Sequence, residues 1–194
     1  KPRYLEEKLD VGQGKLVIGF RLGECMEDPN IAAIYVFNGV YGSGSTSKLF
    51  MNVREKLSLC YYASSIAYIH KGLLLVASGI EFDKFEAARD EIFAQLEAVK
   101  NGDISDEEFN AAKRCVASDL RSLTDSQGEL EGFYLSQTLD GLDYGPMELA
   151  ELVEDVTKED VVSIARSVEC DLIYFLRGLD GEETLEEVAD DGQP

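Results

Sequence analysis

The chain has 194 residues, and its 38 acidic and 18 basic side chains give it a formal net charge of -20 at neutral pH. Such a charge repels phosphate backbones and anionic lipid headgroups, so neither nucleic acid nor a membrane surface is expected as a partner. It attracts basic peptides or proteins, although keeping the protein soluble is a sufficient reason for it. Hydrophobic residues make up 45% of the sequence, which is enough for a folded core.

The cysteines are far apart and form no CxxC pair (Cys25, Cys60, Cys115 and Cys170). This spacing matches neither a zinc ribbon nor a dense disulfide framework. We therefore expect reduced, mostly buried thiols in a cytoplasmic protein. The sequence also has no run of about 18 apolar residues of the kind that indicates a transmembrane helix.

The first part of the chain alternates between strand and helix signals. Residues 15–22 show a strand pattern between glycines, and Asp28-Pro29 is a typical helix start before the apolar segment 30–40. The glycine- and serine-rich stretch 39–47 is expected to connect this buried helix to a second one and to let two backbones approach closely. The second helix carries apolar residues at helical spacing (Leu49, Phe50, Val53 and Leu57).

A β-hairpin and a long helix are predicted next. Residues 61–69 and 73–79 are strand-like, and a short turn that contains His70 and Gly72 separates them. A long amphipathic helix follows, with apolar side chains on one face (Phe85, Ile92, Phe93, Leu96 and Val99) and Asn101-Gly102 at its end.

The rest of the chain is mainly helical until a final strand. Ser105 and Glu108 form a capping box, which indicates the start of a helix. Shorter elements are predicted after it (helices over 129–139 and 146–153, a helix that begins at Thr157, and a strand over 171–177). Residues 180–194 are acidic and lack aromatic side chains, so we expect one domain over 1–179 and a disordered tail over 180–194. The pattern predicts an α+β fold in which one mixed, mainly antiparallel sheet has several helices packed on a face.

The chain offers few ligands for a catalytic metal. Hydrolytic zinc sites use three protein ligands, often two histidines and a carboxylate, together with a carboxylate base. The sequence contains one histidine, His70, which lies in the predicted turn. We therefore predict no metal site and no catalytic residue in this chain alone. A thiol nucleophile paired with His70 is an alternative, but no spacing in the sequence favours it.

Two blocks of sequence occur in a characteristic order. The first contains Ser47-Lys48-Leu49-Phe50, Arg54-Glu55-Lys56 and Leu59-Cys60-Tyr61, and the second is Gly102-Asp103-Ile104-Ser105-Asp106-Glu107-Glu108-Phe109. In this order the chain resembles the insulinase-type (pitrilysin-like) zinc peptidases, a superfamily that includes mitochondrial processing peptidase and the core subunits of respiratory complex III. The resemblance extends from about Lys15 to Arg177. It is closest to the C-terminal, zinc-free half and to small bacterial peptidase-like members that lack the zinc motif.

The resemblance implies a clamshell in which the other half carries zinc in an HxxEH motif, while Arg54 and Tyr61 of this half reach across to a peptide substrate. An arginine fork can hold a peptide carbonyl or carboxylate, and a tyrosine hydroxyl can donate a hydrogen bond to an oxyanion. Cys60 stands where the family usually has a smaller residue, and Tyr62 is the candidate if the register is shifted by one. Both side chains also have a structural interpretation, with Arg54 paired to Glu55 and Tyr61 an ordinary strand aromatic.

Two hypotheses on function follow from the resemblance. The chain is either a non-catalytic half, inactive alone, that closes over a peptide at a zinc site carried by another domain or subunit, or an assembly subunit without proteolysis, like the complex III core proteins. The first hypothesis implies a zinc-bearing homologous partner and a peptide substrate. An HxxEH motif in the partner would favour the peptidase, and its absence would favour assembly.

Overall fold

The computed structural model describes residues 1–23 and 31–179. Five strands form one sheet in the order β1-β5-β2-β4-β3, in which β1 is parallel to β5 and the other neighbouring pairs are antiparallel. The strands are β1 (Arg3–Leu9), β2 (Gly14–Arg21), β3 (Cys60–Tyr68), β4 (Leu73–Ile80) and β5 (Glu169–Gly178). The predicted α+β fold with a mixed, mainly antiparallel sheet is confirmed.

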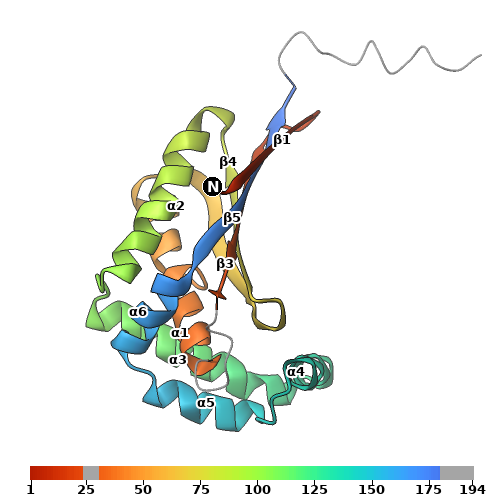
Figure 1. Cartoon of the computed structure of the whole chain (residues 1–194), viewed down its shortest axis with the longest axis vertical. Coiled ribbons are helices and arrows are strands. Elements are labelled where there is room, and N and C mark those ends of the chain that lie inside the picture. The colour runs from red at the N-terminus through yellow and green to blue at the C-terminus, as the bar shows by residue number, and fades with distance from the viewer. Residues whose placement is uncertain (24–30, 180–194) are drawn as a thin grey trace, which may run out of the picture.

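Most of the helices lie on one side of this sheet, whereas α4 (Gln127–Asp140) lies past the turn between β3 and β4 (Figure 1). The α-helices are α1 (Ile31–Tyr41), α2 (Phe85–Lys100), α3 (Asp106–Ser122), α4 (Gln127–Asp140), α5 (Pro146–Asp155) and α6 (Lys158–Ser167). A π-helix, η3 (Leu49–Lys56), and three short 3-10 helices, η4 (Ile69–Lys71), η5 (Phe82–Lys84) and η6 (Leu123–Asp125), connect them to one another and to the strands. Within the part of the chain that the structure describes, no helix is both long and apolar enough to cross a bilayer.

Helix α1 occupies the centre of the core. Nine of its 11 residues are buried, and it contacts β3 as well as α2, α3, α5 and α6. A helix with neighbours on nearly every side can bury apolar residues all around its axis, which explains its unpatterned apolar sequence. Its predicted start at Asp28-Pro29 lies outside the described residues, as do Cys25 and the predicted tail over 180–194.

The predicted strands and helices occur within one or two residues of their expected bounds, and the caps form as expected. The Glu108 amide donates to Ser105 Oγ at 3.1 Å, and the Ser105 amide donates to Glu108 Oε2 at 2.8 Å. Thr157 and Asp160 make the same reciprocal pair at the start of α6. These caps satisfy amides at the helix starts, which would otherwise have no partner within the helix.

Three features differ from the sequence-based expectations. Strand β1 has no predicted counterpart because all seven of its residues are exposed, so it lacks the apolar alternation that indicates a strand. Residues 49–56 form a π-helix rather than an α-helix. The expectation of mostly buried thiols is wrong for the described cysteines, because Cys60 and Cys170 are half-buried and Cys115 is exposed on the solvent side of α3.

The glycine-rich stretch brings the end of α1 against the edge strand β3. The Ser65 amide donates to the Gly42 carbonyl at 3.0 Å, and Ser65 Oγ donates to Asn38 Oδ1 at 2.7 Å. A Cβ atom added to Gly42 would lie 2.4 Å from Ser65 Oγ and 2.7 Å from Leu49 Cδ1. The close backbone approach expected for stretch 39–47 is therefore confirmed at Gly42.

We predict that Gly42→Ala lowers the free energy of unfolding by about 1–3 kcal/mol, because the new methyl group must displace Ser65 and Leu49 in a packed region. Urea unfolding followed by circular dichroism measures the change. Gly12→Ala is the matched control, since a Cβ atom at Gly12 meets nothing within 4 Å. Equal stability of the two variants would show that the contact has no structural importance.

Candidate functional site: the open sheet face and its edge

The face of the sheet opposite the helices has no covering element within residues 1–23 and 31–179. On β2, Leu16, Ile18 and Phe20 are fully buried beneath the helices, whereas Val17 is half-buried on the other face. The pairing of the strands places three rows of residues on that other face, and each row runs across the strands in the order β3, β4, β2, β5 and β1. The rows are Tyr62, Gly79, Lys15, Leu176 and Glu7; Ser64, Ala77, Val17, Tyr174 and Leu5; and Ile66, Leu75, Gly19, Leu172 and Arg3. We call these residues the open face.

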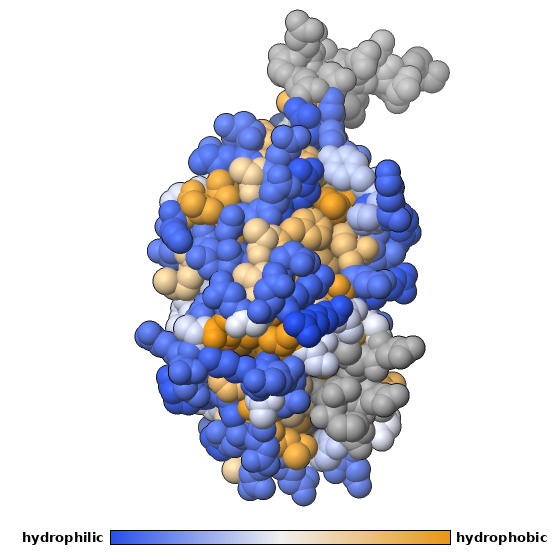
Figure 2. All heavy atoms as spheres, turned by 60° about the vertical axis from the view of Figure 1, so that its left-hand side comes forward, coloured by the Kyte–Doolittle hydropathy of each residue, from blue (hydrophilic) through white to orange (hydrophobic). Residues whose placement is uncertain are grey.

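The open face is more apolar and less acidic than the chain as a whole. Its three rows contain two basic residues, Lys15 and Arg3, against one acidic residue, Glu7, although the whole chain has a net charge of -20. Several large apolar side chains on it are strongly exposed (Leu5 54%, Ile66 53% and Tyr62 38%). The helical side, which Figure 2 brings forward, is mostly hydrophilic with separate apolar patches. A single sheet face that meets only water usually carries polar residues instead.

Arg54 lies in the π-helix η3 at one edge of the sheet. Its guanidinium carbon is 4.7 Å from the centre of the Phe50 ring, and its Nε is 3.6 Å from Glu55 Oε1. The predicted pairing with Glu55 is therefore present, yet 41% of the Arg54 side chain remains exposed. π-Helices are rare and frequently occur at functional sites, where the wider turn changes the direction of a side chain.

Tyr61 is the extra residue of a β-bulge at the start of β3. Cys60 pairs with Ile80 and Tyr62 pairs with Gly79, so Tyr61 has no partner of its own in the register. It is 56% exposed. Bulges leave one residue unpaired and redirect its side chain, and they often adjoin active sites.

Tyr62, the alternative to Tyr61, is held against the sheet. A Cβ atom added to Gly79 would lie 2.5 Å from Tyr62 Cε1, so the Tyr62 ring rests directly on that glycine. Lys15 Nζ also lies 5.3 Å from the centre of the ring. Tyr61 is thus the more accessible of the two tyrosines.

The structure brings Arg54 and Tyr61 to the same end of β3. The Ser58 amide donates to the Arg54 carbonyl at 3.1 Å, and this bond turns the end of η3 back toward β3. Ser58 has a φ of 49°, the one positive value for a non-glycine residue among those described. No hydrogen bond or ion pair joins Arg54 to Tyr61 in the described structure.

A partly buried ion pair joins the two sequence blocks that carry the family resemblance. Lys48, 5% exposed at the start of η3, donates to Glu108 Oε1 of α3 at 3.0 Å. Partial burial tends to raise the pKa of Glu108, but the hydrogen bonds from Ser105 and the Lys48 ammonium outweigh it, so this pKa lies below its ordinary value. Glu108 therefore has two roles, as the capping residue of α3 and as the counter-ion of Lys48.

The described residues do not fit a zinc site. No three His, Cys, Asp or Glu side chains within residues 1–23 and 31–179 converge to hold a metal ion. His70 is exposed in the turn after β3, as expected, whereas Cys60 begins that strand, roughly 25 Å away at the usual rise per residue. Burial also raises the pKa of Cys60, and the nearby Arg54 charge opposes this only in part, so the thiol is a poor nucleophile. A Cys60–His70 dyad is therefore ruled out by distance.

Comparison with known proteins identifies the family. Residues 1–115 match the model of the peptidase M16 inactive domain, so the chain belongs to the M16 peptidase family as an inactive-type domain. It is 39% identical over 181 residues to a protein of Bacillus subtilis described as the probable inactive metalloprotease YmfF, and the match covers 93% of this chain and 42% of that protein. The chain thus spans less than half the length of this relative.

Solved structures show the same fold. A conserved protein from Enterococcus faecalis V583 has a TM-score of 0.84 and 29% identity, with 92% of this chain and 42% of that chain covered. A chain in the structure of complex III2 from Candida albicans has a TM-score of 0.71 and 16% identity, with 91% of this chain and 45% of that chain covered. The predicted membership of the insulinase-type superfamily is confirmed.

We predict that Glu108→Gln lowers the free energy of unfolding at pH 7 by about 1–2 kcal/mol, because it leaves the buried Lys48 ammonium without a full counter-charge. The pKa of Glu108 is lower in the folded chain than in the unfolded one. The stabilisation of the folded chain by the Glu108 carboxylate is therefore fully present above pH 4.5, the ordinary pKa of this group. It is lost as the pH falls through the pKa that Glu108 has in the folded chain. Urea unfolding of both proteins across this pH range measures the difference.

Asp106→Asn is the control on the same helix turn, because Asp106 pairs with Lys158 while its own side chain is 91% exposed. Solvent screening should make its effect much smaller. A stability difference for Glu108→Gln that stays constant from pH 7 to below 4.5 would contradict the assigned role of the ion pair.

Proposed function

We propose that this chain is a non-catalytic peptidase half that closes over a peptide held at a zinc site in a homologous domain or subunit. The observation that carries the proposal is the open face, an uncovered sheet surface with exposed apolar side chains in an inactive-type M16 domain. Contiguous exposed apolar surface of this kind marks a binding site for another protein surface or a ligand. The zinc would be held by the partner, since the described residues of this chain offer no ligand set for it.

In this proposal Arg54 and Tyr61 contact the substrate from the edge of the open face. Arg54 would hold a carbonyl or carboxylate of the peptide through its planar guanidinium, which the Phe50 ring already orients. The Tyr61 hydroxyl would donate a hydrogen bond to the oxyanion that develops at the scissile carbonyl. Their high exposure and shared location at the start of β3 support these roles, because neither side chain contributes to the core.

A second candidate function is assembly without proteolysis. The structural similarity to a chain of complex III2 from Candida albicans favours it, because this fold also occurs within that complex. The similarity at 16% identity concerns the fold alone. In an assembly subunit the open face would bind a protein partner permanently, and Arg54 and Tyr61 would have no substrate to contact.

We predict that peptide cleavage requires the mixture of this chain with a zinc-bearing M16 homologue from the same organism. Arg54→Ala and Tyr61→Phe should each lower kcat/KM of the mixture by at least about tenfold, the loss of one transition-state hydrogen bond or more. A quenched fluorescent peptide monitors cleavage, and binding of the two chains is measured separately by calorimetry.

Arg114→Ala and Tyr134→Phe serve as matched controls, because both residues are exposed on helices away from the start of β3. They should leave kcat/KM unchanged. Cleavage by this chain alone, or full activity of both the Arg54 and Tyr61 variants, would refute the proposed roles. Tight binding of the two chains without any cleavage would support assembly instead.

A further inference from the structure

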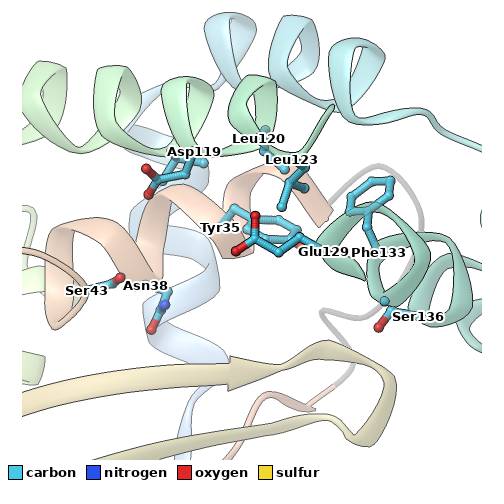
Figure 3. Close-up of a pocket in the computed structure, with 11 residues that line it drawn as sticks. Tyr35, Asn38, Ser43, Asp119, Leu120, Leu123, Glu129, Phe133 and Ser136 are labelled. Carbon is cyan, nitrogen blue, oxygen red and sulfur yellow. The ribbon is translucent and has the colours of Figure 1, made fainter. Parts of the chain in front are cut away.

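A cavity of about 480 Å³ lies between α1, α3 and α4. Helices α1 and α3 pack closely at Gly39, where an added Cβ atom would be 3.3 Å from Ala112 Cβ and 3.2 Å from Val116 Cγ2. The cavity opens beyond this crossing, and α4 forms its remaining wall. Figure 3 shows the side chains that surround it, with Tyr35 and Asn38 from α1, Asp119 and Leu120 from α3, and Glu129 and Phe133 from α4. Its volume is in the range of small-molecule sites.

The residues around this cavity combine apolar walls with negative charge. Leu120, Leu123 and Phe133 form apolar surface, while Asp119 and Glu129 bring two carboxylates. None of the lining residues is basic, and neither carboxylate has an ion-pair partner among the described residues. In Figure 3 the Glu129 side chain extends from α4 toward α1, into the space between the helices.

Helix α4 carries two glycines that packing does not require. A Cβ atom added at Gly128 or Gly132 would meet nothing within 4 Å. Gly128 lies in the first turn of α4, whereas Gly132 lies in its interior. An interior glycine lowers helix stability by about 1 kcal/mol relative to alanine, and neither a close contact nor a positive φ explains the one at Gly132. Gly132 lines the cavity, and any larger residue there would occupy part of its volume.

We propose that this cavity binds a primary amine or guanidinium group on an apolar stem, which is either a small free molecule or a Lys or Arg side chain of another protein. The carboxylates of Asp119 and Glu129, both of which are exposed to solvent, neutralise the cation. The apolar walls take up the stem. An anionic ligand is disfavoured both by these carboxylates and by the net charge of the chain. This site is separate from the open face and does not depend on the proposed peptidase role.

Isothermal titration calorimetry with the whole chain tests the proposal. The probes are 4-phenylbutylamine, its neutral analogue 4-phenylbutan-1-ol and the blocked dipeptide Phe-Lys. We expect the amine or the dipeptide to bind at least about tenfold more tightly than the alcohol, because the two carboxylates attract a cation and not a neutral hydroxyl group. Tighter binding of the dipeptide points to a protein side chain as the natural ligand, and tighter binding of the amine points to a small molecule. Absence of binding by both cations, or equal binding of the alcohol, would overturn the proposal.

Two pairs of variants locate the binding. Gly132→Leu should fill the cavity and weaken binding at least tenfold, whereas Gly128→Leu, in the same helix and outside the cavity, should not. Glu129→Gln should weaken cation binding, whereas Glu131→Gln, exposed on the same helix and not among the lining residues, should not. Leucine is a better helix former than glycine, so both leucine variants should fold, which urea unfolding verifies. Equal affinities within each pair would exclude this cavity as the site.

Discussion

Helices cover only one face of the five-stranded sheet, and the second face exposes a regular array of side chains that includes Val17, Leu75 and Leu172. The covered face supplies the core, because Leu16, Ile18 and the other inward residues are fully buried there. The second face would cost less to expose if it were polar, as in most two-layer sheets that meet water. Its apolar character supports the proposal that another domain, subunit or ligand contacts this face in an inactive-type M16 domain.

The two sequence blocks that carry the family resemblance meet in space, and they separate into residues that hold the fold and residues that do not. Lys48 and Glu108 join η3 to α3 through a partly buried ion pair, and Gly42, just before the first block, allows α1 to reach β3. These are structural contacts. Arg54 and Tyr61 belong to the first block but project from a π-helix and a β-bulge, both of which redirect side chains and leave these two exposed. This difference supports the proposal that these two side chains contact a ligand and not the core.

Local chemistry made most of the elements predictable from the sequence. The capping box at Ser105, the apolar repeat from Phe85 and the turn at Gly72 each act within a few residues, so their outcome does not depend on the rest of the chain. Strand β1 could not be predicted because its partner, β5, lies more than 160 residues away and its own residues are all exposed. The bulge at Tyr61 and the cavity beside α4 likewise arise from tertiary packing, and Gly132 inside α4 is the one local sign of the cavity.

Methyl NMR tests most directly whether the open face is the binding surface of this half. Titration of the isotope-labelled chain with a zinc-bearing M16 partner should shift the methyl signals of Val17, Leu75 and Leu172, which lie on the open face, while those of Leu152 and Met147 on α5 stay in place. The result that would contradict the open-face assignment is the reverse pattern, with shifts confined to α5 and its neighbours, because the partner would then dock on the helices and leave the sheet uncovered.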